Sequence, residues 1–298
     1  MWPVRHSKAL SGSTRSAVPA YSAEAIRDYY DRQTRGFLAL GEGGAVDAIH
    51  RAVWSPDARS ADDAFHFTER RVMDWIGTRP EGRPHILDLG CGVGGSLRYL
   101  AAHADVTGTG LTLSPVQARI GTTRMHASGL EGRIRCLCGD FNAVPLPDRS
   151  ADAVIAIESF VHGATPAAFF SEVARVLRPG GRLFLCDDFR SGDAPAAAQP
   201  SLARFAQGWH LNALLPPDTV RTLADAAGLT LRARHPLTPW LRLGRPRDHA
   251  IAAAVRLFGW LPLERTPVAH VVGGAALQRC LAQGWVTYDM IEFSHKDR

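Results

Sequence analysis

One segment constrains the fold of this chain more than any other: HILDLGCGVGGSLRYLA, residues 85–101. A strand-like apolar run carries Asp88 and leads to a glycine-rich turn, with Gly90, Gly92 and Gly94, that opens a helical pattern. Glycines have no Cβ atom, so such a loop turns tightly and brings its N–H groups close to a ligand at the helix N-terminus. The segment therefore predicts a strand, a ligand-binding loop and a helix at the carboxyl edge of a parallel sheet.

The surrounding pattern extends this prediction to an α/β fold. From residue 85 onward, short apolar runs alternate with helical stretches, which is typical of a mostly parallel, doubly wound sheet with helices on both faces. We expect seven strands, near residues 85–89, 106–111, 134–137, 153–157, 182–187, 230–234 and 286–293.

The N-terminal third has a different pattern. Residues 1–20 are rich in Ser, Arg and Pro and predict a flexible arm, and residues 21–80 predict a helical lid. Within the lid we expect one helix beginning at the N-cap Ser22 and a second over residues 45–54. Residues 81–298 would form the ligand-binding core, with helical insertions at about 189–217 and 236–267.

Composition limits the classes of function. A formal charge of +5 and a pI near 9.2 are compatible with nucleic-acid binding, but the arginines are scattered and the only lysines are Lys8 and Lys296. We therefore expect no nucleic-acid partner. Hydrophobic residues make up 46% of the chain, as in ordinary globular proteins, and no apolar run is long enough for a membrane span or a secretory signal. We expect a cytoplasmic protein without a membrane partner.

The spacing D-x-G-x-G-x-G differs from the dinucleotide fingerprint, which places Gly or Ala three residues after its second Gly. Four further features follow in order: GLTLSPVQ after the second predicted strand, GDF after the third, IES at the fourth and LRPGG before the fifth. Together these motifs resemble those of the class I S-adenosylmethionine-dependent methyltransferases. The resemblance implies a Rossmann-like, seven-stranded sheet with an antiparallel last strand, a helical lid, and S-adenosylmethionine as cofactor.

The resemblance also assigns cofactor-binding residues. In that family the glycine loop, here including Cys91, lines the methionine part of the cofactor, and the aspartate before the loop orders it or reaches the amino group. Asp140 would accept hydrogen bonds from the adenine amino group, and Phe141 would lie against the ring. From the residues alone, Asp140 could instead cap a turn.

The second predicted strand departs from the general family pattern. Most members carry an acid there that binds the ribose hydroxyls, but this chain has Thr112 and Leu113, followed by Gln117. The form G-x-T-L-S-x-x-Q resembles that of cyclopropane fatty acid synthases and of sterol and isoprenoid C-methyltransferases, in which the Gln helps to hold the ribose. The lid sequence from Tyr29 resembles that of terpenoid C-methyltransferases of bacterial secondary metabolism.

This subgroup methylates carbon–carbon double bonds, and the implied reaction requires residues that control a carbocation. A carboxylate and aromatic faces suit that task. Glu158, in the run IESFVH, matches the Glu of sterol and geranyl diphosphate C-methyltransferases and would be catalytic while also lining the cofactor site. His162 would orient Glu158 or act as a base, with a satisfied loop histidine as the alternative. Trp209 would form a cation wall, or else pack in the core.

The acceptor would be a small isoprenoid, either a prenyl diphosphate or a prenylated secondary metabolite, deprotonated or cyclised after methylation. If it is a diphosphate, Mg²⁺ would bridge its phosphate oxygens and a carboxylate, and Arg27, Arg35, His50 and Arg51 would contact the phosphates. If it is a prenylated aromatic or peptide-derived product, these four residues would be solvated helix faces. No metal-ligating set is predicted in the protein itself. The predicted substrate-binding residues are Tyr29, Tyr30, Phe37, His50, Arg51, Phe160 and His210.

Two other functions are compatible with the sequence. One is an O- or N-methyltransferase of a polyketide or peptide product, with His162 or His210 as the base. The other is a subunit that binds S-adenosylmethionine without catalysis. The aromatic first helix could also dock on a neighbouring copy, which predicts a homo-oligomer.

Overall fold

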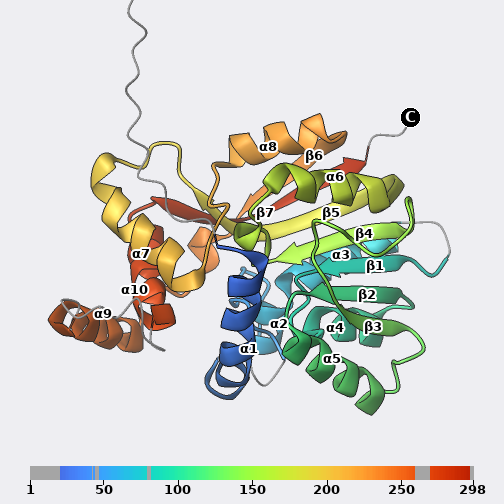
Figure 1. Cartoon of the computed structure of the whole chain (residues 1–298), viewed down its shortest axis with the longest axis horizontal. Helices are drawn as coiled ribbons and strands as arrows, with labels where there is room; N and C mark the ends of the chain where they lie inside the picture. Colours follow the sequence, from blue (N-terminus) through green and yellow to red (C-terminus); the bar gives the residue numbers. More distant parts are fainter. Residues whose placement is uncertain (1–20, 42, 44–46, 79–81, 259–268, 296–298) are drawn as a thin grey trace, which may run out of the picture.

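The fold is built on one sheet with helices on both faces (Figure 1). The computed structural model describes residues 21–41, 43, 47–78, 82–258 and 269–295, so the predicted arm at residues 1–20 lies outside the described residues. The strands are β1 His85–Leu89, β2 Thr107–Thr112, β3 Ile134–Cys138, β4 Ala151–Ile157, β5 Leu177–Arg190, β6 Leu229–Pro236 and β7 Val286–His295. The helices are α1 Ala23–Leu40, α2 Ala61–Phe65, α3 Phe67–Gly77, α4 Gly95–His103, α5 Pro115–Ala127, α6 Pro166–Val176, α7 Gln199–Trp209, α8 Pro217–Ala226, α9 Pro246–Phe258 and α10 Ala269–Ala282.

The strand order is β3-β2-β1-β4-β5-β7-β6. Pairs among β1 to β5 are parallel, and β7 is antiparallel to both β5 and β6. This arrangement confirms the predicted mostly parallel seven-stranded sheet with an antiparallel last strand. The central strand β4 is buried along its whole length, which explains its mostly apolar sequence ADAVIAI. Its one charged residue, Asp152, accepts a hydrogen bond from His85 N and forms an ion pair with Arg178.

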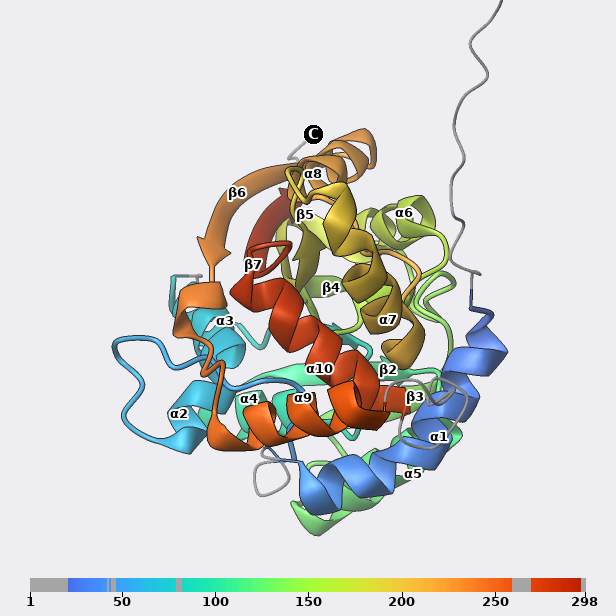
Figure 2. The same cartoon turned by 90° about the vertical axis from the view of Figure 1, so that its left-hand side faces the viewer.

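Alternate side chains of each strand pack on opposite helical layers. Ile86 of β1 packs with residues of α3, α4 and α5, whereas Leu87 lies in the cluster that includes α6 and α8. A third apolar cluster joins α7, α10 and the ends of β5 and β7. Figures 1 and 2 show α7 and α10 side by side at the carboxyl ends of the parallel strands, with α1 next to them. The site is therefore formed where these helices cover that edge.

Helix α1 begins at the predicted cap, where the Ser22 Oγ accepts a hydrogen bond from Ala25 N at 3.2 Å. Farther along α1, the Asp31 carboxylate accepts hydrogen bonds from the Ser114 hydroxyl and, at 3.4 Å, from Val116 N. Because Ser114 and Val116 lie at the N-terminus of α5, Asp31 adds negative charge at the positive end of that helix. These contacts attach α1 to the N-terminus of α5.

The prediction of a second helix over residues 45–54 is wrong for residues 47–54. These residues belong to a loop over residues 47–60. Asp47 has a positive φ of 60° and forms ion pairs with Arg98 and, at 2.7 Å, Arg124. Farther along the loop, Val53 N donates to Ala64 O and Trp54 N to Trp240 O. These tertiary contacts outweigh the local helical pattern.

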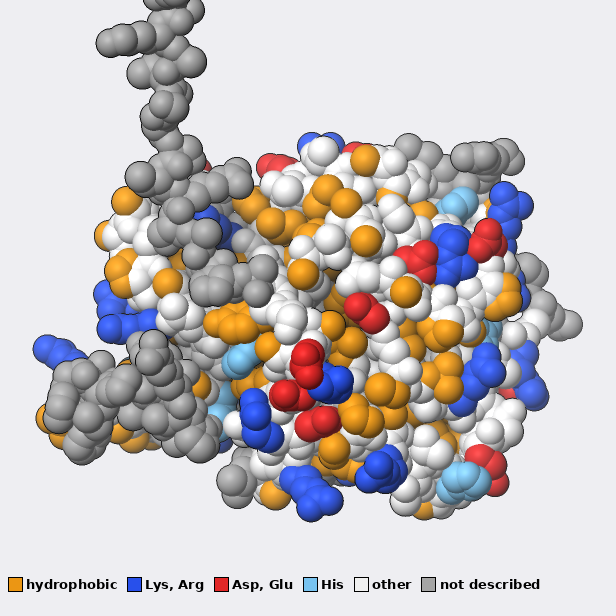
Figure 3. Space-filling model, in the orientation of Figure 1, with side chains coloured by type: hydrophobic (Ala, Val, Ile, Leu, Met, Phe, Trp, Pro, Cys, Tyr) orange, Lys and Arg blue, Asp and Glu red, His pale blue; other side chains and the backbone are white. Residues whose placement is uncertain are grey.

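The surface and the helices give two further observations. On the face shown in Figure 3, acidic and basic side chains lie interspersed around α1, without a patch of one sign. Within the described ranges, none of the helices combines the length and the apolar character needed to cross a bilayer.

Candidate active site

The glycine loop adopts a backbone that only glycine allows without strain. Gly90, Gly92 and Gly94 have φ values of +86°, +54° and +79°. A Cβ atom on Gly90 would lie 2.2 Å from the Ser159 Cβ, so the loop can approach the end of β4 only without a side chain there. Gly90 N and Cys91 N both donate to the carbonyl of Leu111, at 2.8 and 3.0 Å, which holds the loop against β2.

A cavity of about 150 Å³ lies over this loop, enclosed by α1, the 47–60 loop, the ends of β1, β2 and β4, and α7. It brings together most of the residues that the sequence predicted for the cofactor and the acceptor. These are Tyr29, Tyr30, Phe37, His50, Asp88, Gly90, Cys91, Gly92, Thr112, Leu113, Gln117, Phe141, Glu158, His162 and Trp209.

Five predicted residues, Arg51 and the four described next, are not among the described lining residues of this cavity. Gly94 is the N-cap of α4. The Asp140 Oδ1 accepts hydrogen bonds from Asn142 N and Nδ2, at 2.8 and 3.0 Å, so this oxygen caps a turn. That Asp140 binds the adenine amino group stays a prediction. Phe160 packs in the core against Phe169 and Phe170 instead of facing the cavity. The His210 ring packs in a tilted arrangement against the rings of Tyr21 and Tyr29 and does not line the cavity.

Asp88 is suited to a cationic ligand group. Its carboxylate is 3% exposed, lines the cavity and has no hydrogen bond within the described part of the chain. Burial raises the pKa of Asp88 well above its ordinary value, because the charged form lacks a partner there. An ammonium group in the cavity would supply that partner. The amino group of S-adenosylmethionine fits this requirement, and the open glycine loop provides room for it.

Gln117 connects the cavity to the lid. Its Oε1 accepts a hydrogen bond from Thr112 Oγ1 at 2.6 Å, and its Nε2 donates to Thr34 Oγ1 of α1 at 3.1 Å. One amide hydrogen therefore remains for a ligand hydroxyl. That the side chain holds a ribose stays a prediction.

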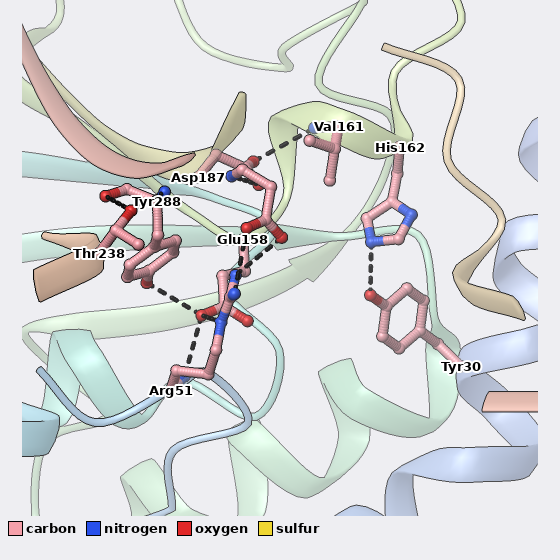
Figure 4. A network of polar contacts seen from close by, with 9 residues as sticks. Tyr30, Arg51, Glu158, Val161, His162, Asp187, Thr238 and Tyr288 are labelled. Carbon is pink, nitrogen blue, oxygen red and sulfur yellow. Dashed lines mark hydrogen bonds and ion pairs between the residues drawn. The ribbon is translucent and has the colours of Figure 1, made fainter. Parts of the chain in front are cut away.

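Glu158 lies at the centre of a buried charge cluster (Figure 4). It has a positive φ of 49°, a strained conformation of the kind that often occurs at functional sites. Its Oε1 accepts three hydrogen bonds, from Arg51 N at 2.9 Å, Arg51 Nε at 3.0 Å and Tyr288 Oη at 2.9 Å. Burial by itself would raise the pKa of Glu158, but Arg51 and His50 hold it below its ordinary value. Glu158 is therefore an ionised carboxylate at neutral pH.

Arg51 is fully engaged within this cluster. Its Nη1 and Nη2 donate to the two carboxylate oxygens of Asp188, at 3.0 and 2.8 Å, and its guanidinium lies 4.0 Å from the centroid of the Tyr288 ring. The predicted role of Arg51 as a phosphate contact does not agree with this bidentate pairing. Arg27 forms ion pairs with Glu24 and Asp28 on the exposed side of α1.

Tyr30 and His162 form a second polar pair at the cavity wall (Figure 4). Tyr30 Oη lies 2.7 Å from His162 Nε2, and His162 Nδ1 lies 3.2 Å from the carbonyl of His210. Because a carbonyl can only accept, Nδ1 carries the proton and Nε2 accepts from the tyrosine hydroxyl. Burial lowers the pKa of His162 to about 4, so the ring is neutral at pH 7.

His50 is a buried cation beside the cavity. Its Nε2 lies 3.7 Å from Glu69 Oε1, and the same oxygen accepts a hydrogen bond from Ser96 Oγ at 2.6 Å. Burial opposes protonation of His50, but Glu69 and Glu158 raise its pKa to about 9. Ser96 lies in the first turn of α4, directly after the glycine loop. Glu69 therefore contacts both the His50 imidazolium and the residue that follows this loop.

Sequence reasoning missed Tyr288, Asp187, Asp188 and Glu69. One signal was available for two of them, because Asp187 and Asp188 are consecutive acids near the end of the fifth predicted strand, at the edge where ligands bind. Asp187 accepts hydrogen bonds from Val161 N and Asp188 N, and its pKa is raised well above the ordinary value by burial and by Asp188. No group of three His, Cys, Asp or Glu side chains within the described ranges forms a site for a metal ion.

The chain is similar to known methyltransferases in sequence and in fold. Residues 87–185 match the profile of a methyltransferase domain family. The chain is 32% identical over 222 residues to the methyltransferase GfsG of Streptomyces halstedii, covering 74% of this chain and 78% of that protein. It is 29% identical over 268 residues to 24-methylenesterol C-methyltransferase 2 of Oryza sativa subsp. japonica, covering 86% and 73%. The fold is similar to that of geranyl diphosphate C-methyltransferase of Streptomyces coelicolor A3(2), with a TM-score of 0.69, 16% identity and coverage of 92% and 97%.

Proposed function

Because the chain belongs to the class I S-adenosylmethionine-dependent methyltransferases, we propose that it methylates an alkene carbon of a small isoprenoid acceptor. The similarity to a sterol C-methyltransferase and to a geranyl diphosphate C-methyltransferase supports carbon as the methylated atom. In this proposal Asp88 binds the amino group of the cofactor, and the glycine loop and Gln117 bind its remaining polar groups. The sulfonium of the bound cofactor supplies the methyl group.

One observation carries this proposal: the second carboxylate oxygen of Glu158. Oε1 accepts three hydrogen bonds, whereas Oε2 has no hydrogen-bond partner in the described part of the chain. Glu158 lines the cavity together with the aromatic side chains of Tyr30, Phe37 and Trp209. A fixed anion surrounded by aromatic faces is suited to a carbocation, which both groups stabilise electrostatically.

The reaction balances with this set of groups. The alkene π electrons form the new carbon–carbon bond as the methyl–sulfur bond breaks, and the positive charge passes from sulfur to the acceptor carbon. The cation then loses a C–H proton to give a new alkene, or a neighbouring π bond captures it and a ring forms. In this mechanism Glu158 stabilises the cation and receives the proton on Oε2. The aromatic wall keeps water from the cation.

The proposal is tested with methyl-labelled S-adenosylmethionine and a panel of geranyl, farnesyl and dimethylallyl diphosphates and prenylated aromatics, with and without Mg²⁺. Mass spectrometry should place the label on a prenyl carbon, and Mg²⁺ should be needed only for a diphosphate. Glu158→Gln retains the acceptor for Arg51 and Tyr288 but removes the charge, and should lower kcat at least 100-fold. Glu172→Gln, which removes a carboxylate paired with Arg175 outside the site, should not. Near-normal turnover of Glu158→Gln would refute the role of that residue.

A second candidate function is O- or N-methylation, and the Tyr30–His162 pair favours it. His162 is neutral at pH 7 and lines the cavity, so it can take a proton from Tyr30 while Tyr30 takes one from a polar acceptor. Label found only on oxygen or nitrogen, with turnover lost in Tyr30→Phe, would select this function. Tight binding of S-adenosylhomocysteine without turnover on any acceptor would instead indicate a subunit that binds the cofactor without catalysis.

A further inference from the structure

A second cavity, of about 310 Å³, adjoins the first. Such a volume lies in the range of small-molecule sites, roughly 300–1,000 Å³. The two cavities meet at Glu158, because both are lined by Phe37, Ala48, Ile49, His50, Glu158 and Trp209. A molecule in the second cavity therefore reaches Glu158 at the boundary between the two cavities.

Much of the lining of this cavity is apolar, and it includes Trp54, Phe65, Leu241, Ile251 and Leu277. On α10, which is packed against α9, Gly274 also lines the cavity, and a Cβ atom there would have no atom within 4 Å. The face of α10 at Gly274 is therefore open to a ligand.

Arginines also line this cavity. Arg242, Arg245, Arg247 and Asp248 are among its lining residues, and Asp248 forms an ion pair with Arg245 at 3.3 Å. The Arg242 guanidinium is stacked 3.2 Å from the centroid of Trp54 and has no carboxylate partner among the described residues. An arginine oriented by an aromatic ring is well suited to bind a carboxylate or phosphate.

We propose that the second cavity binds the acceptor as an elongated apolar molecule with an anionic end, held by Arg242, with its reactive carbon at Glu158. The inference rests on the proposed function and adds the chemical class of the acceptor and its orientation. Arg51 cannot take the anion because Asp188 and Glu158 already neutralise it. The head group of the proposed acceptor is an anion, either a carboxylate or a diphosphate.

The test measures binding of three probes with one carbon chain, geranyl diphosphate, geranic acid and geraniol, to the full chain saturated with S-adenosylhomocysteine. Calorimetry at pH 7.5 should show at least one of the two anions binding ten-fold or more tightly than geraniol. Which anion binds more tightly identifies the head group. Arg242→Ala should abolish the preference with the S-adenosylhomocysteine affinity unchanged, Arg242→Lys should restore part of it, and Arg221→Ala, on the distant α8, should leave it intact.

The outcomes separate the two proposals. Equal binding of the three probes, no binding of any at millimolar concentration, or an unchanged preference in Arg242→Ala would overturn the assignment of the cavity. Anion-selective binding combined with label transfer only to oxygen or nitrogen would overturn alkene methylation and support the cavity assignment.

Discussion

Acid should destabilise this protein through one histidine. His162 is 5% exposed, and burial lowers its pKa from 6.5 to about 4. Between these two values the unfolded chain binds a proton that the folded chain does not, so the free energy of unfolding falls as the pH falls. For these two pKa values, the contribution of His162 is about 2 kcal/mol smaller at pH 5 than at pH 7, and about 3 kcal/mol is lost once the pH is below 4.

The measurement is urea unfolding followed by tryptophan fluorescence at several pH values between 7 and 5, for the wild type and for His162→Gln. The variant keeps an acceptor for Tyr30 but has no titrating ring, so its loss of stability over this range should be about 2 kcal/mol smaller than that of the wild type. His126→Gln, at a histidine with a 66% exposed side chain, should follow the wild type. Parallel curves for the wild type and His162→Gln would refute the assignment of a neutral, buried His162.

Three further changes should have measurable effects. Asp88→Asn removes the charge that we propose to bind the cofactor ammonium, so calorimetry should show S-adenosylhomocysteine binding at least about ten-fold more weakly; an unchanged affinity would contradict that contact. Glu69→Ala leaves the His50 imidazolium without its carboxylate and should lower the free energy of unfolding by about 3–5 kcal/mol, while a loss below about 1 kcal/mol would mean that His50 is neutral. Gly90→Ala forces a positive φ and a 2.2 Å contact with Ser159, so it should cost at least about 1–3 kcal/mol, and Ser159→Gly in the same chain should recover part of that loss.

Local sequence determined the parts of the structure that depend on neighbouring residues. The glycine loop was predictable because three positive φ values within five residues require glycine, and the strands were predictable because a parallel sheet buries both faces of each strand. Strand β5 begins at Leu177, five residues before its predicted start, because LRPGG continues the strand and Leu177 pairs with Ala151. The position of Glu158 at the edge of the sheet followed from its place after a buried strand.

Only the tertiary structure decided the charges and the contacts of the site. Arg51 and Glu158 are 107 residues apart, and Tyr288 and Glu158 are 130 residues apart. No local pattern indicates that these side chains meet, or that they leave one oxygen of Glu158 without a partner. The conformation of residues 47–60 was equally out of reach, because its backbone forms hydrogen bonds with the distant residues Ala64 and Trp240. Local propensity determines where the helices and strands form, whereas burial and long-range pairing determine which side chains of the site are ionised.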